Sequence, residues 1–168
     1  MKLLARINGG ITFVVGALLL VATLSITIQI AIRFLLTRFG LNISAPWTEE
    51  LCRYCITWSV FLGAGVLCRD GRLIAVDFLV HVLPVKPSMV LETFSIAMTL
   101  VFFGLTGWLG WQLFHDGFNE TSPVMRIPMA YVYAAVPLGA VLAVANGLAF
   151  MVDRLSFPER PHPSEVME

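Results

Sequence analysis

Residues 7–32 read INGGITFVVGALLLVATLSITIQIAI, a run that contains no Asp, Glu, Lys or Arg. Three further stretches are equally free of these charges: residues 54–68, 93–114 and 127–152. A bilayer core needs about 20 apolar residues as a helix, because each residue rises about 1.5 Å and every backbone amide must be bonded within the segment. Three stretches reach that length, and the second reaches it when residues 46–53 add its first turns, with Arg53 extending to the interface.

The sequence therefore predicts an all-α membrane protein, with a single domain over residues 1–152 and four transmembrane helices. Their expected ranges are about 11–32, 46–68, 88–114 and 129–152. The chain is 58% hydrophobic and 13% charged, whereas soluble domains are roughly 25% charged. Its net charge is zero, so nothing indicates nucleic acid as a partner. Lys2 and Arg6 precede the first run as in a signal peptide, but the run exceeds a signal-peptide core of about 7–15 residues, so we expect it to remain as a helix.

The distribution of basic residues predicts the orientation, because cytoplasmic loops carry an excess of Lys and Arg. With the N-terminus in the cytoplasm, seven basic residues lie inside: Lys2, Arg6, Arg69, Arg72, Lys86, Arg154 and Arg160. Four then lie outside: Arg33, Arg38, Arg53 and Arg126. We therefore expect both termini to be cytoplasmic. The tail over residues 153–168 contains three prolines and few apolar residues, which is typical of disorder.

The segment SAPWTEE, residues 44–50, has the signs of a helix start. Ser44 or Thr48 can cap the first amides, Pro46 suits the first turn, and the two glutamates complement the positive end of the helix dipole. Glu49 and Arg53 are four residues apart, in the favourable order for a helical ion pair. The segment is either only a well-capped helix start or also a contact with a neighbouring protein.

Between the second and third helices, residues 73–83 place Asp77 and His81 four apart among aliphatic residues, and Pro84 follows. This pattern predicts a short amphipathic helix on the cytoplasmic surface of the membrane. Periodicity leaves two interpretations open. The segment is a solvated connector, or it is a docking segment for a partner subunit.

Small residues recur in the last two helices at spacings that favour close helix packing in lipid. The fourth helix carries them every four residues, and the third carries them every three. These residues are Ala135, Gly139, Ala143 and Gly147 in the fourth helix, and Gly104, Gly107 and Gly110 in the third. We expect packing within the chain, with at least one face left for lipid or a partner. Pro137 is expected to kink the fourth helix.

No expected span holds a charged residue or a histidine near its centre, where an ion site or proton relay would need one. The three histidines, His81, His115 and His162, have no spacing that would gather a metal. We therefore expect no metal or cofactor, and an autonomous exporter is disfavoured. Cys52 and Cys55 form a C-x-x-C pair that suggests a membrane thiol oxidoreductase as the alternative. Relaying oxidation needs a second cysteine pair, and only Cys68 remains.

An ordered set of residues resembles the small membrane subunit of TRAP transporters, the DctQ-type component of the tripartite ATP-independent periplasmic transporters. The family pattern is approximately W-[ST]-E-E, then R-[YF], W, F-x-G-[AS], R-x-G and [VI]-D. The matching residues are Trp47, Thr48, Glu49, Glu50, Arg53, Tyr54, Trp58, Phe61, Gly63, Ala64, Arg69, Gly71, Val76 and Asp77. The chain departs from the pattern at Leu73, where many members have a polar residue, and at Cys52 and Cys55.

The resemblance implies a subunit that is not an enzyme, in the inner membrane of a bacterium or archaeon. In such systems a periplasmic binding protein captures an organic acid, often a carboxylate, and a large membrane subunit moves it inward with a sodium gradient. The small subunit binds the large one, braces its scaffold and helps to dock the loaded binding protein. Sodium and substrate sites are then expected on the large subunit, and lipids surround both.

The resemblance also implies roles for residues at the two ends of the second helix. An outer signature comprises Trp47, Glu49, Glu50 and Arg53, followed within the helix by Trp58 and Gly63. An inner signature comprises Arg69, Gly71, Arg72 and Asp77. Both are expected to stabilise helix ends or contact the large subunit. Candidate contacts with the binding protein are Arg38, Asp116, Glu120 and Arg126.

Overall fold

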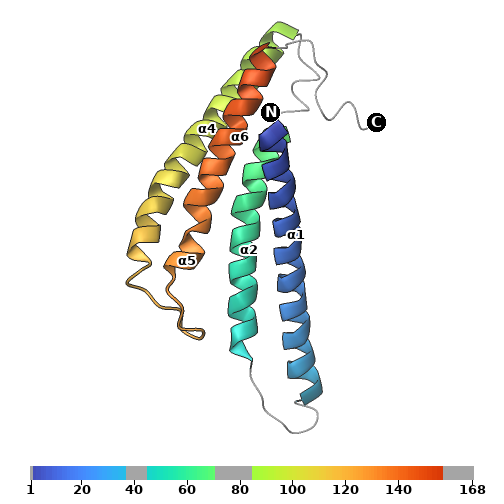
Figure 1. Ribbon diagram of the computed structural model, residues 1–168, viewed down its shortest axis with the longest axis vertical. Coiled ribbons are helices and arrows are strands. Elements are labelled where there is room, and N and C mark those ends of the chain that lie inside the picture. The colour runs from blue at the N-terminus through green and yellow to red at the C-terminus, as the bar shows by residue number, and fades with distance from the viewer. Residues whose placement is uncertain (1, 37–44, 71–84, 157–168) are drawn as a thin grey trace.

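Four long helices run alternately up and down in the computed structural model, which describes residues 2–36, 45–70 and 85–156 (Figure 1). They are α1 (Lys2–Ala31), α2 (Pro46–Leu67), α4 (Val85–Asp116) and α6 (Ala135–Ser156). Three short elements adjoin them: a π-helical turn η1 (Ile32–Leu36), a 3-10 turn η2 (Cys68–Asp70) and α5 (Ala130–Tyr133). The expected amphipathic segment, residues 73–83, lies outside the described residues, as does the tail from residue 157.

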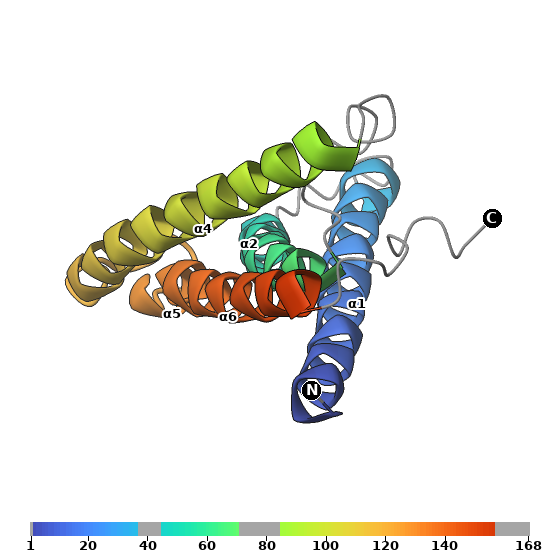
Figure 2. The same ribbon diagram turned by 90° about the horizontal axis from the view of Figure 1, so that it is seen from above.

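The helices form an open row in which α1 packs against α2, α2 against α6, and α6 against α4. Figure 1 shows the two antiparallel pairs, α1 with α2 and α4 with α6. Seen from above, α1 is tilted in a different direction from α4 and α6, and α2 lies between α1 and α6 (Figure 2). Within the described part of the chain, each outer helix therefore packs against one neighbouring long helix.

Three helical segments of the described chain are long and apolar enough to cross a membrane: Leu4–Phe34, Thr93–Asp116 and Ala130–Asp153. The prediction of four such helices was wrong in this respect, because α2 is helical but is not apolar enough to be counted as a membrane-crossing segment. Its first two turns carry Glu49, Glu50 and Arg53. Of these three residues only Glu50 is buried, whereas the side chains of Glu49 and Arg53 are more than 60% exposed. Further along, α2 packs between α1 and α6.

The helix boundaries differ from the sequence-based ranges at three points. Helix α1 begins at Lys2 rather than near residue 11, because the polar first turns continue the same helix. Helix α6 continues to Ser156, so the first residues of the expected tail are helical. A break at Ala134 separates α5 from α6. It lies three residues before Pro137, which cannot donate the helical bond to the Tyr133 carbonyl. The kink expected at Pro137 stays a prediction.

The start of α2 is capped differently from the prediction. Pro46 occupies the first turn as expected, but Ala45 is the N-cap residue and no side chain caps it. Thr48 is fully buried, and its hydroxyl donates a 2.7 Å hydrogen bond to the Ala45 carbonyl rather than accepting one from a free amide. Ser44 lies outside the described residues.

The small-residue stripe of α6 packs within the chain, and at Gly139 it meets α2. A Cβ atom at Gly139 would lie 2.6 Å from the backbone oxygen of Phe61, so the two backbones are in direct contact. Ala135 and Ala143 are almost completely buried. On α2, a Cβ atom at Gly65 would lie 2.7 Å from the Leu142 side chain. Helices this close gain dispersion contacts that lipid cannot supply.

The glycines that join α4 to α6 meet the prediction only in part. A Cβ atom at Gly147 would lie 3.0 Å from Leu100, and one at Gly107 would lie 3.1 Å from Ala140. Gly110 belongs to the same three-residue spacing, and a Cβ atom there would lie 2.6 Å from the Val136 side chain. At Gly104 the prediction of packing within this chain is wrong, because a Cβ atom there would meet nothing within 4 Å.

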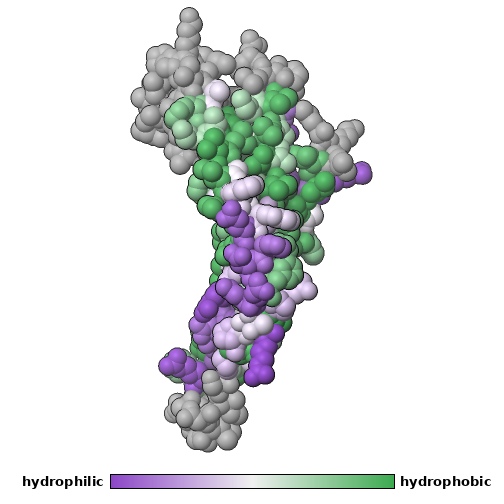
Figure 3. Space-filling model, turned by 90° about the vertical axis from the view of Figure 1, so that its left-hand side faces the viewer, coloured by the Kyte–Doolittle hydropathy of each residue, from purple (hydrophilic) through white to green (hydrophobic). Residues whose placement is uncertain are grey.

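Large apolar side chains cover the outside of α1 and α4. Phe13 is 79% exposed, and on α4 Phe102 and Trp108 are 62% and 67% exposed. Exposed apolar surface on this scale is unfavourable in water but is satisfied by lipid or a protein partner. Figure 3 shows a face whose upper half is mostly hydrophobic, whereas hydrophilic residues gather in its lower half.

We expect Gly139→Ala to lower the free energy of unfolding by about 1–3 kcal/mol, because the added methyl group must displace the Phe61 backbone. Gly104→Ala is the matched control and should leave stability unchanged or slightly raised, since Ala favours a helix over Gly. Thermal unfolding of the purified chain in detergent, followed by circular dichroism, compares the two variants. Equal midpoints would contradict the backbone contact.

Candidate functional site

The carboxylate of Glu50 connects the first turns of α2 to the loop between α4 and α5, residues 117–129. It accepts hydrogen bonds from the hydroxyls of Tyr54 and Ser122, both on Oε1. The backbone N–H of Met125 donates to Oε2 at 2.9 Å. Only 6% of Glu50 is exposed. A buried carboxylate is stable when several donors replace the water it has lost, as these do.

Backbone hydrogen bonds give the 117–129 loop a defined turn around this carboxylate. The Ser122 amide donates to the Ile127 carbonyl at 2.9 Å, and the Arg126 amide donates to the Ser122 carbonyl at 3.2 Å. Thr121 and Pro128 form an isolated antiparallel bridge. Arg126 has a φ of 54°, a left-handed conformation that is uncommon outside glycine. Because Glu50 binds both sides of this turn, it holds an otherwise exposed loop in one conformation.

The loop and the last residue of α4 together contain three of the residues expected to contact a binding protein, and all three are exposed. Asp116 ends α4, and its carbonyl accepts the Asn119 amide at 3.0 Å. Glu120 accepts a 3.1 Å hydrogen bond from the Tyr133 hydroxyl, which fixes its side chain against α5. Arg126 lies in the tight turn. The fourth candidate, Arg38, lies outside the described residues.

The rest of the outer signature lies on the surface of α2. Glu49 and Arg53 form the predicted ion pair at 3.2 Å, with side chains 63% and 69% exposed. Such pairs contribute only about 0.3–0.5 kcal/mol to a helix, so this one is not a major stabilising contact. Trp47 is 47% exposed and Trp58 is partly buried. A Cβ atom at Gly63 would lie 3.9 Å from Val15 of α1, an ordinary packing distance.

At the opposite end of α2, Arg69 pairs with Asp153 of α6 at 2.6 Å. Both side chains are about a quarter exposed, so water screens this pair less than the pair of Glu49 with Arg53. The sequence singled out Arg69 but gave no partner for it. The other members of the inner signature, Gly71, Arg72 and Asp77, lie outside the described residues.

A buried amide pair connects three helices near the Arg69 end. Asn8 of α1 and Asn146 of α6 exchange two hydrogen bonds of 3.0 Å, and the Asn146 amide also donates to the Gly65 carbonyl of α2 at 2.9 Å. Neither asparagine was assigned a role from the sequence. The signal was present, because Asn8 and Asn146 are the two asparagines of otherwise apolar runs. Interhelical hydrogen bonds in membranes contribute about 0.6 kcal/mol each on average.

The cysteines do not form a redox centre. Cys52 and Cys55 are unpaired, only 4% and 6% exposed, and packed with Ala22 of α1. A catalytic thiol must be accessible and stabilised as a thiolate, whereas these lie in an apolar helix contact. Cys68, also free, packs with Phe103 of α4 and the small residues of α6. Among the described residues, the site therefore consists of a buried carboxylate with its loop, ion pairs and helix contacts.

Comparison with known proteins identifies the class. Residues 22–157, well over half of the chain, match the family described as tripartite ATP-independent periplasmic transporters, DctQ component. The chain belongs to the DctQ family. The resemblance noted in the sequence is thereby confirmed, and the chain is a TRAP transporter small subunit in a family of transporter components.

Two curated relatives agree with this membership. A TRAP transporter small permease protein of Haemophilus influenzae is 27% identical over 120 residues, which cover 71% of this chain and 74% of that protein. The C4-dicarboxylate TRAP transporter small permease protein DctQ of Rhodobacter capsulatus is 26% identical over 125 residues. That match covers 72% of this chain but 54%, about half, of the Rhodobacter protein.

The region that matches the DctQ family includes Glu50 and the loop residues that bond it, since α2 and the 117–129 loop both fall inside residues 22–157. It begins within α1, beyond Asn8, so one half of the buried amide pair lies outside the matched region. The two ends of α2 are thus held by different means in this DctQ-family chain. One end uses a carboxylate and a loop, and the other uses an ion pair to α6.

We expect Glu50→Gln to expose the 117–129 loop to trypsin after Arg126, with cleavage severalfold faster than in the original chain. The amide of Gln turns a donor toward groups that already donate to Glu50, so the turn loses its anchor. Glu49→Gln is the matched control, because Glu49 is bonded to Arg53 and not to the loop. Mass spectrometry of the fragments measures the rates, and equal rates in both variants would contradict the anchoring role.

Proposed function

We propose that this chain pairs with a large TRAP permease subunit, braces its scaffold and helps to dock a substrate-loaded periplasmic binding protein during sodium-driven uptake of an organic acid. Membership of the DctQ family supports a transporter subunit. The name of the Rhodobacter relative, a C4-dicarboxylate transporter component, supports a carboxylate as substrate. The observation that carries the docking role is the 117–129 loop, which Glu50 holds in a fixed turn at one end of the helices.

The proposed orientation places the Glu50 end in the periplasm and both termini in the cytoplasm of a bacterial or archaeal cell. Both ends of the described chain, Lys2 and Ser156, lie at the other end of the row (Figure 1). The excess of Lys and Arg at that end supports a cytoplasmic position. In this arrangement α2 crosses the inner membrane as a fourth span, with its polar turns at the outer surface and α1 and α6 beside it.

The open row suits a bracing role because its outer helices keep apolar faces free. Helix α4 exposes Val101, Leu105 and Trp108 along its length, and α1 exposes Phe13 and Leu20. A large subunit that covers one of these faces buries apolar surface and gains dispersion contacts, so its scaffold resists tilting. The remaining face contacts lipid.

The polar groups inside the row are already occupied within the chain, which supports a partner as the carrier of sodium and substrate. Asn8 and Asn146 bond each other, and Glu50 receives three donors. A transport site needs polar groups that exchange their partners for an ion or solute. We therefore assign no such site to this chain.

Reconstitution tests this function. Liposomes that contain this chain, the large permease subunit and the binding protein should take up a carboxylate when a sodium gradient is imposed. Liposomes that lack this chain should lose most of the uptake, and liposomes that contain it alone should have none. Uptake by this chain alone would instead indicate an autonomous transporter. Undiminished uptake in its absence would contradict the proposed role in transport.

We expect Arg69→Ala and Asp153→Ala to reduce co-purification of the large subunit to a similar extent, because each breaks the same 2.6 Å ion pair that fixes the end of α2 to α6. The double variant should reduce the yield of the large subunit by no more than either single variant does, because both residues act through one contact. A pull-down from cells that co-express both subunits measures the yield. A much larger loss in Arg69→Ala than in Asp153→Ala would mean that Arg69 contacts the partner directly.

A further inference from the structure

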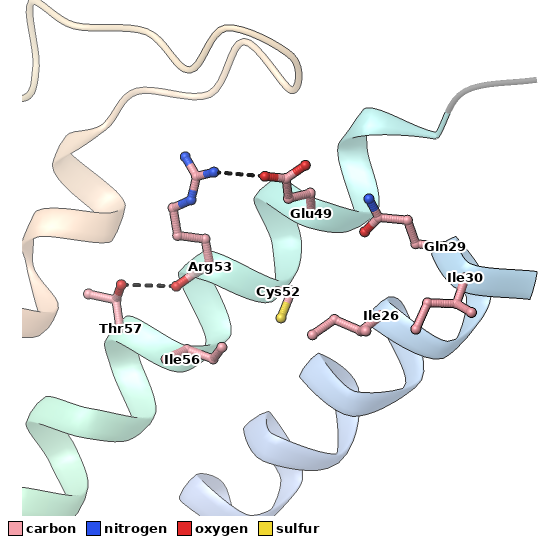
Figure 4. Close-up of a pocket in the computed structure, with 8 residues that line it drawn as sticks. All are labelled: Ile26, Gln29, Ile30, Glu49, Cys52, Arg53, Ile56 and Thr57. Atoms are coloured by element: carbon pink, nitrogen blue, oxygen red, sulfur yellow. Dashed lines mark hydrogen bonds and ion pairs between the residues drawn. The ribbon is translucent and has the colours of Figure 1, made fainter. Parts of the chain in front are cut away.

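An open groove of about 530 Å³ lies between α1 and α2 at the Glu50 end of the row. Its volume is in the range of small-molecule sites, roughly 300–1,000 Å³. Figure 4 shows the two walls, which converge on Cys52. The lining residues are Ile26, Gln29 and Ile30 of α1, and Glu49, Cys52, Arg53, Ile56 and Thr57 of α2.

The polarity of the groove changes along its length. Toward the end of α2, its rim carries the exposed ion pair of Glu49 and Arg53. Deeper along both helices, the walls are Ile26 and Ile56. One turn further along α1, Ala22 packs with Cys52. A charged rim above an apolar slot matches an amphiphile whose head lies at the membrane surface and whose tail enters the bilayer.

We propose that this groove binds a zwitterionic phospholipid with a free amine, of the phosphatidylethanolamine type. The guanidinium of Arg53 offers a planar set of donors to the phosphate, and the carboxylate of Glu49 accepts from the ammonium group. The two charges lie 3.2 Å apart, side by side as they are in the lipid head. One acyl chain occupies the slot between Ile26 and Ile56. The Gln29 side chain lies on the α1 wall, where an ester carbonyl of the lipid passes.

Charge complementarity favours this lipid over the other occupants of an apolar groove. A helix of the large subunit would have to remove water from Glu49 and Arg53, whose side chains are more than 60% exposed, without replacing it. An anionic lipid would satisfy Arg53 but place its phosphate beside the Glu49 carboxylate, which repels it. A zwitterionic head satisfies both groups at once.

The inference rests on the proposed position of α2 in the membrane, but its test does not depend on transport. Native mass spectrometry of the purified full chain in detergent, with phosphatidylethanolamine or phosphatidylglycerol added at equal concentration, measures lipid binding directly. We expect stronger binding of phosphatidylethanolamine. A chain that binds lipid as expected but supports no uptake would contradict the proposed function alone.

Charge variants test the head group. Arg53→Gln should weaken binding of phosphatidylethanolamine by about tenfold, because a hydrogen bond between charged groups is lost. Glu49→Gln should reverse the preference toward phosphatidylglycerol, since Arg53 is then an unpaired cation. Arg6→Gln is the matched control, an exposed arginine at the opposite end of α1. A lipid preference that is the same in all three variants would overturn the proposal.

Shape variants test the slot. Ile26→Trp fills the groove and should reduce phosphatidylethanolamine binding by about tenfold, the same order as the charge variant. Ile28→Trp is its control, because Ile28 is exposed on the same helix but does not line the groove. Circular dichroism confirms that both variants remain helical. Equal lipid binding in the two variants would overturn the proposal. A second result would also overturn it: no lipid binding by the original chain, together with loss of large-subunit co-purification in Ile26→Trp. That result would indicate that a helix of the large subunit occupies the groove.

Discussion

The close contact between α2 and α6 is the interaction on which the rest of the structure depends. Helix α2 carries Glu49, Glu50 and Arg53 in its first two turns, and it is not among the described segments apolar enough to cross a membrane. The backbones touch at Gly139 and Phe61, and Asn146 bonds the Gly65 carbonyl further along the same contact. Because hydrocarbon supplies no hydrogen bonds, these polar groups must find partners in protein. The row is held at its centre, and α1 and α4 pack onto that centre from the two sides.

The two ends of this central helix then determine what the surface can do. At one end the Glu50 carboxylate holds the 117–129 loop, so a short turn with Arg126 in a left-handed conformation has a fixed shape. A preformed loop binds a partner without a large loss of conformational entropy. At the other end Arg69 pairs with Asp153 of α6, and Lys2 and Ser156, the ends of the described chain, lie on the same side.

Several site residues were identified from the sequence, but their partners were identified only where both lie on one helix. The pair of Glu49 with Arg53 followed from helical spacing, because both lie on one helix and need no knowledge of the fold. Glu50 was picked out by the same segment, yet its partner Ser122 is 72 residues away in the chain. Arg69 likewise pairs with Asp153 across two helices. The glycine stripe of α6 was predicted correctly, whereas Gly104 faces outward because α4 is the last helix of the row.

The sequence by itself determined that the chain is helical and in the membrane, and its ordered signature indicated the DctQ family. Hydropathy and helical periodicity depend on neighbouring residues, so they can be read along the chain. Only the tertiary structure decided the order of the helices, the burial of α2 and the groove between α1 and α2. These depend on which distant backbones approach each other, and that is fixed by the sum of many weak contacts in which no single residue carries the signal.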